Sequence, residues 1–195
     1  MGEAVELRQT LSSSDPEGQR EYLDWDLHSL EFYHSEAGNP AAAAIAREKL
    51  IELRHVLSTG DAESYRLNLA SWSNGFAWHL REFDRPEKGF KHAEESVSII
   101  RAAPSMEDPA VALSLACSLD TAAACLHDLG RWEEALVYSE EAVGLIRELH
   151  SRESDNIQYH DHLVDILEMY GKVLGALGRT EAVERLVQEA TSLKV

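Results

Sequence analysis

The sequence predicts an all-α protein, an α-solenoid of about four helix-turn-helix repeats with a period of 46–48 residues. A recurring turn signal is the first reason, because fixed spacing of such signals is typical of repeat proteins. The signal occurs at Gly38-Asn39-Pro40, Asp84-Arg85-Pro86, Gly130-Arg131-Trp132 and Gly178-Arg179-Thr180. The segments between the turns carry apolar residues at helical spacing, and no segment of any length alternates with the period of two that a strand requires.

The repeats divide the chain into a lead-in, residues 1–14, and a single domain, residues 15–195. The expected repeats are 15–60, 61–107, 108–154 and 155–195. In the first repeat, Asp15-Pro16 is typical of a capped helix start with proline in the first turn. That helix is expected to reach Ala37, and its successor to run from Asn39-Pro40 to Thr59-Gly60, where glycine ends it.

The three remaining repeats are each expected to contain two helices. The second pair covers about 62–83 and 86–102, the third 109–129 and 131–150, and the fourth 155–177 and 180–193. Each helix has an apolar stripe that only neighbouring helices can bury, as in Leu113, Ala116, Leu119, Ala123 and Leu126. Small residues indicate close helix crossings, where bulkier side chains would overpack: Ala77, Gly89, Ala123, Ala135 and Gly171.

Net charge, the start of the chain and the cysteines limit which partners, which compartment and which cross-links we expect. A formal net charge of −17 argues against nucleic acid or an anionic membrane as a direct partner, because both require a basic surface. The start of the chain lacks the basic and apolar blocks of a signal peptide, so we expect a cytoplasmic protein. Cys117 and Cys125 fall on one expected helix about 12 Å apart, too far for a disulfide. Both are expected to be free thiols.

Residues 130–136, Gly-Arg-Trp-Glu-Glu-Ala-Leu, followed by Glu141-Ala142-Val143, resemble the turn and second helix of the tetratricopeptide repeat (TPR). Tyr170-Gly171 and Leu174 are similar to first-helix positions of that family. The family's usual period is 34 residues. The longer period here resembles the long-repeat members, such as kinesin-light-chain-like and fungal or bacterial proteins.

The resemblance implies a non-catalytic protein-interaction module that binds a protein or peptide segment in a concave groove lined by the first helices. Its partner is expected to be a basic segment with an apolar anchor, because the groove would be aromatic at one end and acidic at the other. Carried over position by position, the groove residues are Trp25, His28, Phe32, Ser71, Asn74, Trp78, Arg81, Asp120, Ala124, His127, Asp165, Glu168 and Lys172.

Several aromatic residues have a competing interpretation, because large rings at helical spacing are often core. Trp72, Phe76, Phe83 and Phe90 are expected in the core. For Trp25, Phe32 and Trp78 both core and contact positions remain open.

The nine histidines do not predict a metal site or a catalytic centre. His160 and His162 lie two residues apart, so on a helix they point to different faces, and zinc normally takes three or four convergent ligands. No nucleophile motif or phosphate-binding glycine loop occurs. The sequence therefore predicts no enzyme, no cofactor and no metal.

Two alternatives remain open. The aromatic end of the groove could hold a small molecule or a reaction site, with His28, Asn74 or Arg81 as polar contacts. The chain could instead self-associate or form part of a longer array through its last helix, whose apolar stripe has no later repeat beside it: Val183, Leu186, Val187, Ala190 and Leu193.

Overall fold

In the computed structural model, the described residues are 27, 29–30, 32–34, 37–39, 42, 62–103 and 107–193. The chain forms two compact units, Met1–Asn68 and Leu69–Val195. Most of the first expected repeat lies outside the described residues. The division into a lead-in and one domain of four repeats therefore stays a prediction.

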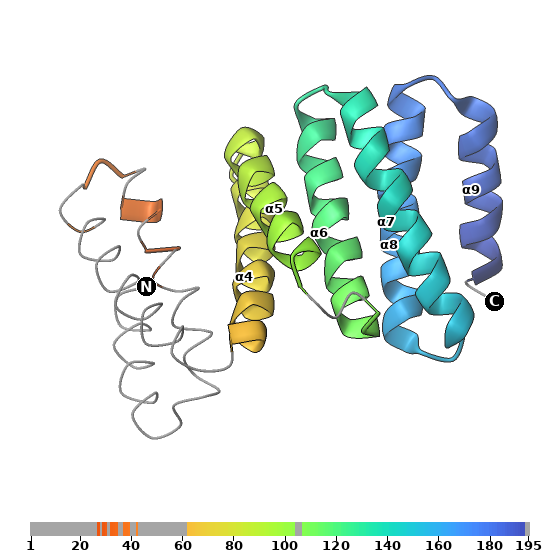
Figure 1. Ribbon diagram of the computed structural model, residues 1–195. Helices are drawn as coiled ribbons and strands as arrows, with labels where there is room; N and C mark the ends of the chain where they lie inside the picture. The colour runs from red at the N-terminus through yellow and green to blue at the C-terminus, as the bar shows by residue number, and fades with distance from the viewer. Residues whose placement is uncertain are drawn as a thin grey trace. The chain divides into compact units, whose positions relative to one another are not determined.

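The described part of the chain from residue 62 onward is all helical (Figure 1). Its elements are α4 (Ala62–Glu82), α5 (Pro86–Arg101), α6 (Pro109–Asp128), α7 (Trp132–Arg152), α8 (Ile157–Ala176) and α9 (Thr180–Leu193). These bounds agree with the expected helices to within a few residues. The predicted all-α fold class is confirmed.

The recurring turns share one backbone geometry. Positive φ angles occur at Gly38, Gly130 and Gly178, each at 71°, and at Asp84, at 58°. In each turn the next residue donates its N–H to the carbonyl five residues back, for example Arg131 N to Leu126 O at 2.9 Å. This six-to-one hydrogen bond is the Schellman ending of a helix. The periodic signal in the sequence thus marks a repeated helix end.

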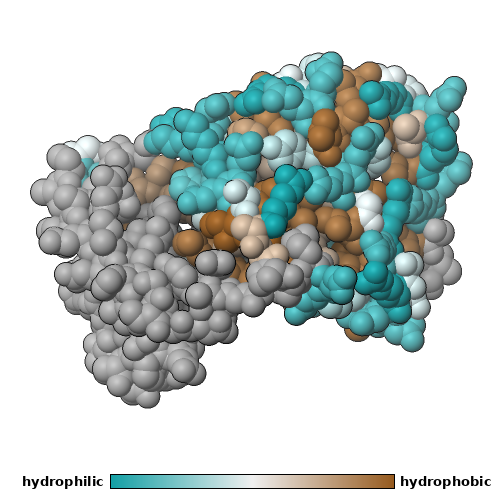
Figure 2. Space-filling view, viewed as in Figure 1, coloured by the Kyte–Doolittle hydropathy of each residue, from teal (hydrophilic) through white to brown (hydrophobic). Residues whose placement is uncertain are grey.

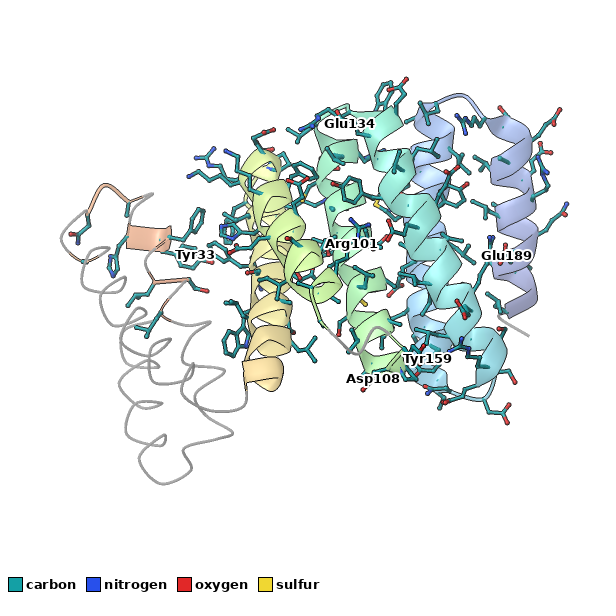
Figure 3. The ribbon with its side chains drawn as sticks, viewed as in Figure 1. Tyr33, Arg101, Asp108, Glu134, Tyr159 and Glu189 are labelled. Carbon is teal, nitrogen blue, oxygen red and sulfur yellow. The ribbon has the colours of Figure 1, made fainter. Side chains whose placement is uncertain are left out.

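The starts of α6 and α8 are capped by side chains. Asp108 (labelled in Figure 3) accepts a hydrogen bond from the N–H of Ala110 at 2.8 Å, and Pro109 occupies the first turn of α6. Asn156 Oδ1 accepts from Gln158 N and Tyr159 N at the start of α8. Since these caps satisfy backbone donors that a helix start leaves free, they fix where two of the first helices begin.

Helix α6 forms the centre of the core. Its predicted stripe, Leu113, Ala116, Leu119, Ala123 and Leu126, is buried, and the helix packs against α5, α7 and α8. By length and composition α6 could also cross a membrane, but 67% of its most apolar window is buried inside the protein. Such burial is typical of the central helix of a packed array.

The close packing predicted at small residues holds at some positions and fails at one. Gly89 of α5 lies so near α4 that an added Cβ would be 2.8 Å from the carbonyl oxygen of Ala77. Ala123 and Ala135 are fully buried. The expectation for Gly171 is wrong, because a Cβ there would meet nothing within 4 Å. The tight approach is therefore between α4 and α5, where Gly89 permits it.

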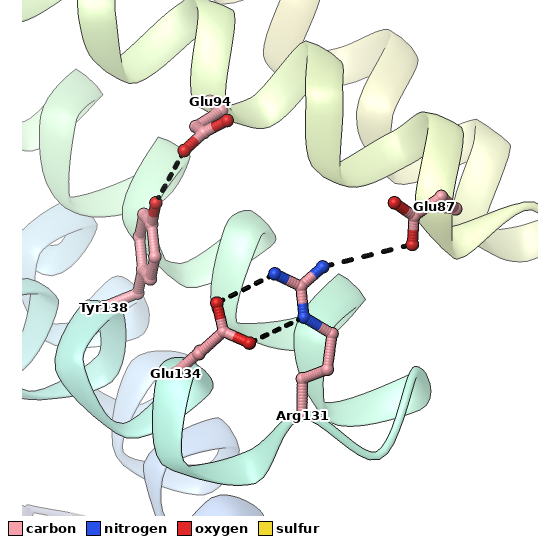
Figure 4. A network of polar contacts seen from close by, with 5 residues as sticks. All are labelled: Glu87, Glu94, Arg131, Glu134 and Tyr138. Carbon is pink, nitrogen blue, oxygen red and sulfur yellow. Dashed lines mark hydrogen bonds and ion pairs between the residues drawn. The ribbon is translucent and has the colours of Figure 1, made fainter.

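Polar contacts join neighbouring repeats along α5, α7 and α9. Tyr138 of α7 donates to Glu94 of α5 at 3.1 Å, and Arg131 lies 4.0 Å from Glu87 of α5 (Figure 4). Arg131 is held in place by two hydrogen bonds to Glu134 of its own repeat, at 2.7 and 2.8 Å. Arg147 pairs with Glu189, labelled in Figure 3, at 2.6 Å. Figure 2 shows the face of the protein formed by α5 and α7. Hydrophilic residues cover much of this face, and hydrophobic residues lie among them.

The aromatic residues expected in the core and the apolar residues of α9 differ in how far they are buried. Phe76 and Phe90 are buried as expected, whereas Phe83 is 49% exposed, so its core assignment is wrong. On α9, Leu186 is buried but Val187 is 59% exposed. Phe83 and Val187 lie on the outer surface of the described part. Self-association through α9 stays a prediction.

Candidate functional site: a groove between α4, α6 and α8

One groove of about 380 Å³ is lined by the first helices of the three described repeats. Because every lining residue comes from α4, α6 or α8, the helices that would form the concave side of a solenoid supply the whole surface. The lining residues are Asn74, Trp78, Arg81, Cys117, Asp120, Thr121, His162, Asp165, Ile166, Glu168, Met169 and Lys172.

Helical spacing explains how these residues reach one surface. Positions 74, 78 and 81 recur at intervals of four and three on α4, and positions 165, 168 and 172 recur at intervals of three and four on α8. Residues three or four apart lie on one face of a helix. Helix α6 also packs against α5 and α7, and α8 packs against α7 and α9.

Seven of the thirteen predicted groove residues line this groove: Asn74, Trp78, Arg81, Asp120, Asp165, Glu168 and Lys172. His127 does not belong to the lining. Trp25 and His28 lie outside the described residues, and Phe32 belongs to the first unit, where its ring meets Tyr33 edge-on at 5.7 Å.

Two other predicted groove residues, Ala124 and Ser71, do not line the groove. Ala124 is fully buried in the cluster that includes Ala122 and Cys125, so it cannot face a partner. Ser71 is exposed but is not among the lining residues. The groove is therefore narrower along α6 than the sequence pattern predicts.

The edge of the groove on α4 is formed by Trp78 and Arg81. The guanidinium carbon of Arg81 lies 5.0 Å from the centre of the Trp78 ring, a cation–π contact. Arg81 also donates from Nε to Asp128 Oδ2 at 2.5 Å, and Asp128 contacts His127 at 3.4 Å. Trp78 nevertheless remains 42% exposed. An aromatic face is thus held in place and open to solvent.

Asp120 is the most unusual charged group of the groove. Burial and the nearby Asp165 raise its pKa to about 7, although Arg81 and Lys172 act in the opposite direction. Its Oδ1 atom is buried and has no hydrogen-bond partner within the described part of the chain. Near neutral pH this carboxyl group is therefore divided between its neutral and charged forms.

A second buried acceptor and a thiol lie in the same groove. Asn74 Oδ1 also lacks a hydrogen-bond partner among the residues that the structure describes. The Cys117 thiol lies 3.7 Å from His162 Nδ1. Burial, Asp120 and Asp165 raise the pKa of Cys117 to about 12, so the thiol stays protonated and is a poor nucleophile.

Histidine positions do not form a metal centre in the described ranges. No three His, Cys, Asp or Glu side chains gather there as ligands would. His162 lines the groove, whereas His160 lies with its ring 5.9 Å from that of His150. The two histidines thus have different surroundings, as their spacing predicts.

Five lining residues were not predicted from the sequence: Cys117, Thr121, His162, Ile166 and Met169. Helical spacing could have found the first and third, because Cys117 is three residues before Asp120 and His162 three before Asp165. Ile166 and Met169 are buried apolar residues, and the pattern alone assigns such residues to the core.

Comparisons with known proteins support the fold. No protein-family model matches the chain, and no curated protein matches it by sequence. The structure is that of a TPR-like helical repeat. Among solved structures it is similar to BtubC (BKLC) from P. vanneervenii, with a TM-score of 0.50 and 17% sequence identity; the match covers 99% of this chain and 87% of that one.

Proposed function

We propose that the protein is a non-catalytic interaction module of the long-repeat TPR type, which binds a protein or peptide segment in the groove between α4, α6 and α8. One observation carries the proposal. Side chains from the first helices of three successive repeats line a single groove in which an aromatic face, at Trp78, is exposed. Hydrophobic and aromatic anchors supply most binding energy in such interfaces.

The chemistry of the groove indicates the kind of segment. Trp78 offers exposed apolar surface, and Asp165 and Glu168 offer carboxylates. A basic segment with one apolar anchor would fit this groove, because its anchor would contact the apolar surface and its cations would pair with the carboxylates. The overall charge of −17 would assist the approach of such a partner. We place this binding in the cytoplasm, with no cofactor.

The experiment begins with peptides selected from a random display library on the full chain, followed by binding measurements with two tryptophan variants. Trp78 and Trp132 are 42% and 39% exposed, but only Trp78 lines the groove. Trp78→Ala should weaken binding of the selected peptides about tenfold or more, since aromatic hot spots contribute 2 kcal/mol or more. Trp132→Ala is the matched control and should leave the affinity unchanged.

Two results would speak against the proposal. One is a set of selected peptides that bind both variants as well as the wild type. The other is a loss of binding with Trp132→Ala and not with Trp78→Ala, which would show that the peptide binds at α7 and not in the groove. Circular dichroism of each variant verifies that the helices are intact.

A further inference from the structure

The groove contains two buried hydrogen-bond acceptors that have no donor. Asp120 Oδ1 of α6 and Asn74 Oδ1 of α4 are both buried and unpaired within the described residues, and both side chains line the groove. Buried acceptors are nearly always satisfied in folded proteins, because an unsatisfied one loses its hydration without compensation. Two such atoms, on two helices that line one groove, indicate that a donor is supplied from outside.

The charges around these acceptors favour a cationic donor. Asp120, Asp165 and Glu168 contribute three carboxyl groups, and Arg81 and Lys172 contribute two cations. Arg81 is held by Trp78 and Asp128. Among the described residues, neither Arg81 nor Lys172 forms an ion pair with Asp120 or Asp165. The acidic side of the groove therefore keeps an excess of acceptors.

We propose that the groove binds an arginine side chain of the partner segment, with its guanidinium donating to Asp120 and Asn74. This inference rests on the proposed segment-binding function. A guanidinium carries five N–H donors in a fixed plane, so it can serve acceptors on two helices at once. Its aliphatic stem can lie along an exposed apolar side chain, which Trp78 provides at the edge of this groove.

Binding of an arginine side chain should also be linked to the release of a proton from Asp120. A cation beside Asp120 stabilises its charged form, so binding should lower the pKa of Asp120 from about 7 and release a proton. Arginine itself does not titrate in this range. Other groups facing the site are Arg81 on α4, Cys117 on α6, and His162, Asp165, Glu168 and Lys172 on α8. Of these, His162 requires its own control, because its protonation would also repel a cation.

The test uses the full chain, labelled with ¹⁵N, and three small probes, of which Nα-acetyl-lysine amide distinguishes an ammonium from a guanidinium. Nα-acetyl-arginine amide is titrated at pH 8, and Nα-acetyl-citrulline amide serves as its neutral isostere. We expect shifts at groove amides and affinity at least tenfold higher for the arginine probe. Asp120→Asn should remove that preference. Asp161→Asn, an exposed position on α8 that does not line the groove, should keep it.

The same probe tests the linkage. With a free pKa near 7, affinity at pH 6 should be about tenfold lower than at pH 8. His162→Gln should retain most of this difference, and Asp120→Asn should lose it.

Equal affinity for the arginine and citrulline probes would overturn the proposal, and so would an unchanged preference in Asp120→Asn. Tighter binding of Nα-acetyl-lysine amide would replace it with an ammonium site. If binding of the selected peptides depends on Trp78 but not on any arginine, the proposed segment binding is supported and the proposed arginine site is wrong. If no peptide binds in the groove, both proposals are wrong.

Discussion

Asp165 of α8 raises the pKa of Asp120 of α6 across the groove, in addition to the larger effect of burial. The two residues lie 45 positions apart in the sequence, close to one repeat period, and they occupy the first helices of successive repeats. Stacking of repeats thus brings two like charges together. We therefore expect the cost of ionising Asp120 to make the stability of the protein depend on pH.

Replacing Asp120 with asparagine should stabilise the free protein at pH 8 and have little effect at pH 4. The folded state raises the pKa of Asp120 from 3.8 to about 7, so the folded protein binds a proton more tightly than the unfolded chain. Stability is therefore lost as the pH rises through this range, by on the order of 2–4 kcal/mol. Urea unfolding of both proteins from pH 4 to pH 8 measures the difference. A gap that does not widen with pH would contradict the assignment.

Two glycine-to-alanine variants should change stability in opposite directions. Gly89→Ala forces a Cβ to 2.8 Å from Ala77 O, so it should destabilise the protein by about 1–3 kcal/mol in spite of better helix propensity. Gly144→Ala on α7 meets nothing within 4 Å and should stabilise by about 0.5–1 kcal/mol. Thermal unfolding compares them. Stabilisation by Gly89→Ala would show that α4 and α5 are farther apart than described.

Asp84→Gly should stabilise the protein by about 0.5–1 kcal/mol. Asp84 has a φ of 58°, whereas glycine occupies the matching turn positions 130 and 178, and left-handed backbone is unfavourable for residues with a Cβ. The reciprocal variant, Gly130→Asp, should destabilise by a similar amount. Denaturant midpoints of the two variants test the shared turn geometry, and effects of equal sign would argue against it.

Cys117 should react slowly with iodoacetamide at pH 8, at least a hundredfold more slowly than in the unfolded chain. Only the thiolate reacts, and burial with Asp120 and Asp165 raises the pKa of Cys117 to about 12. Mass spectrometry separates its rate from that of Cys125, which is fully buried. A rate close to that of the unfolded chain would show that the groove is more open or less acidic than described.

Much of the fold is predictable because its determinants are local. The turn at Gly130 requires a left-handed residue followed by a helix start, and both are visible in adjacent sequence positions. Asp84 shows the limit of this reasoning, since only the period, and not the residue type, marks it as the same turn. Phe83 beside it was expected in the core because rings usually are, yet the turn leaves it exposed.

The groove was predicted less completely because it depends on which face of each helix remains uncovered. Asn74, Trp78 and Arg81 follow from helical spacing on α4. Ala124 has the same spacing from Asp120, but the α6 helix is buried so widely that its groove face is narrow. The missing donors at Asn74 and Asp120 concern single atoms in three dimensions, which a linear pattern does not contain.

Amide chemical-shift mapping with a library-selected peptide is the most direct test of the central claim, that the first helices form the binding surface. We predict that the largest changes fall at residues 74–81, 117–121 and 162–172, which line the groove, and that they shrink in Trp78→Ala but not in Trp132→Ala. Changes concentrated on α5 and α7 instead would contradict the account.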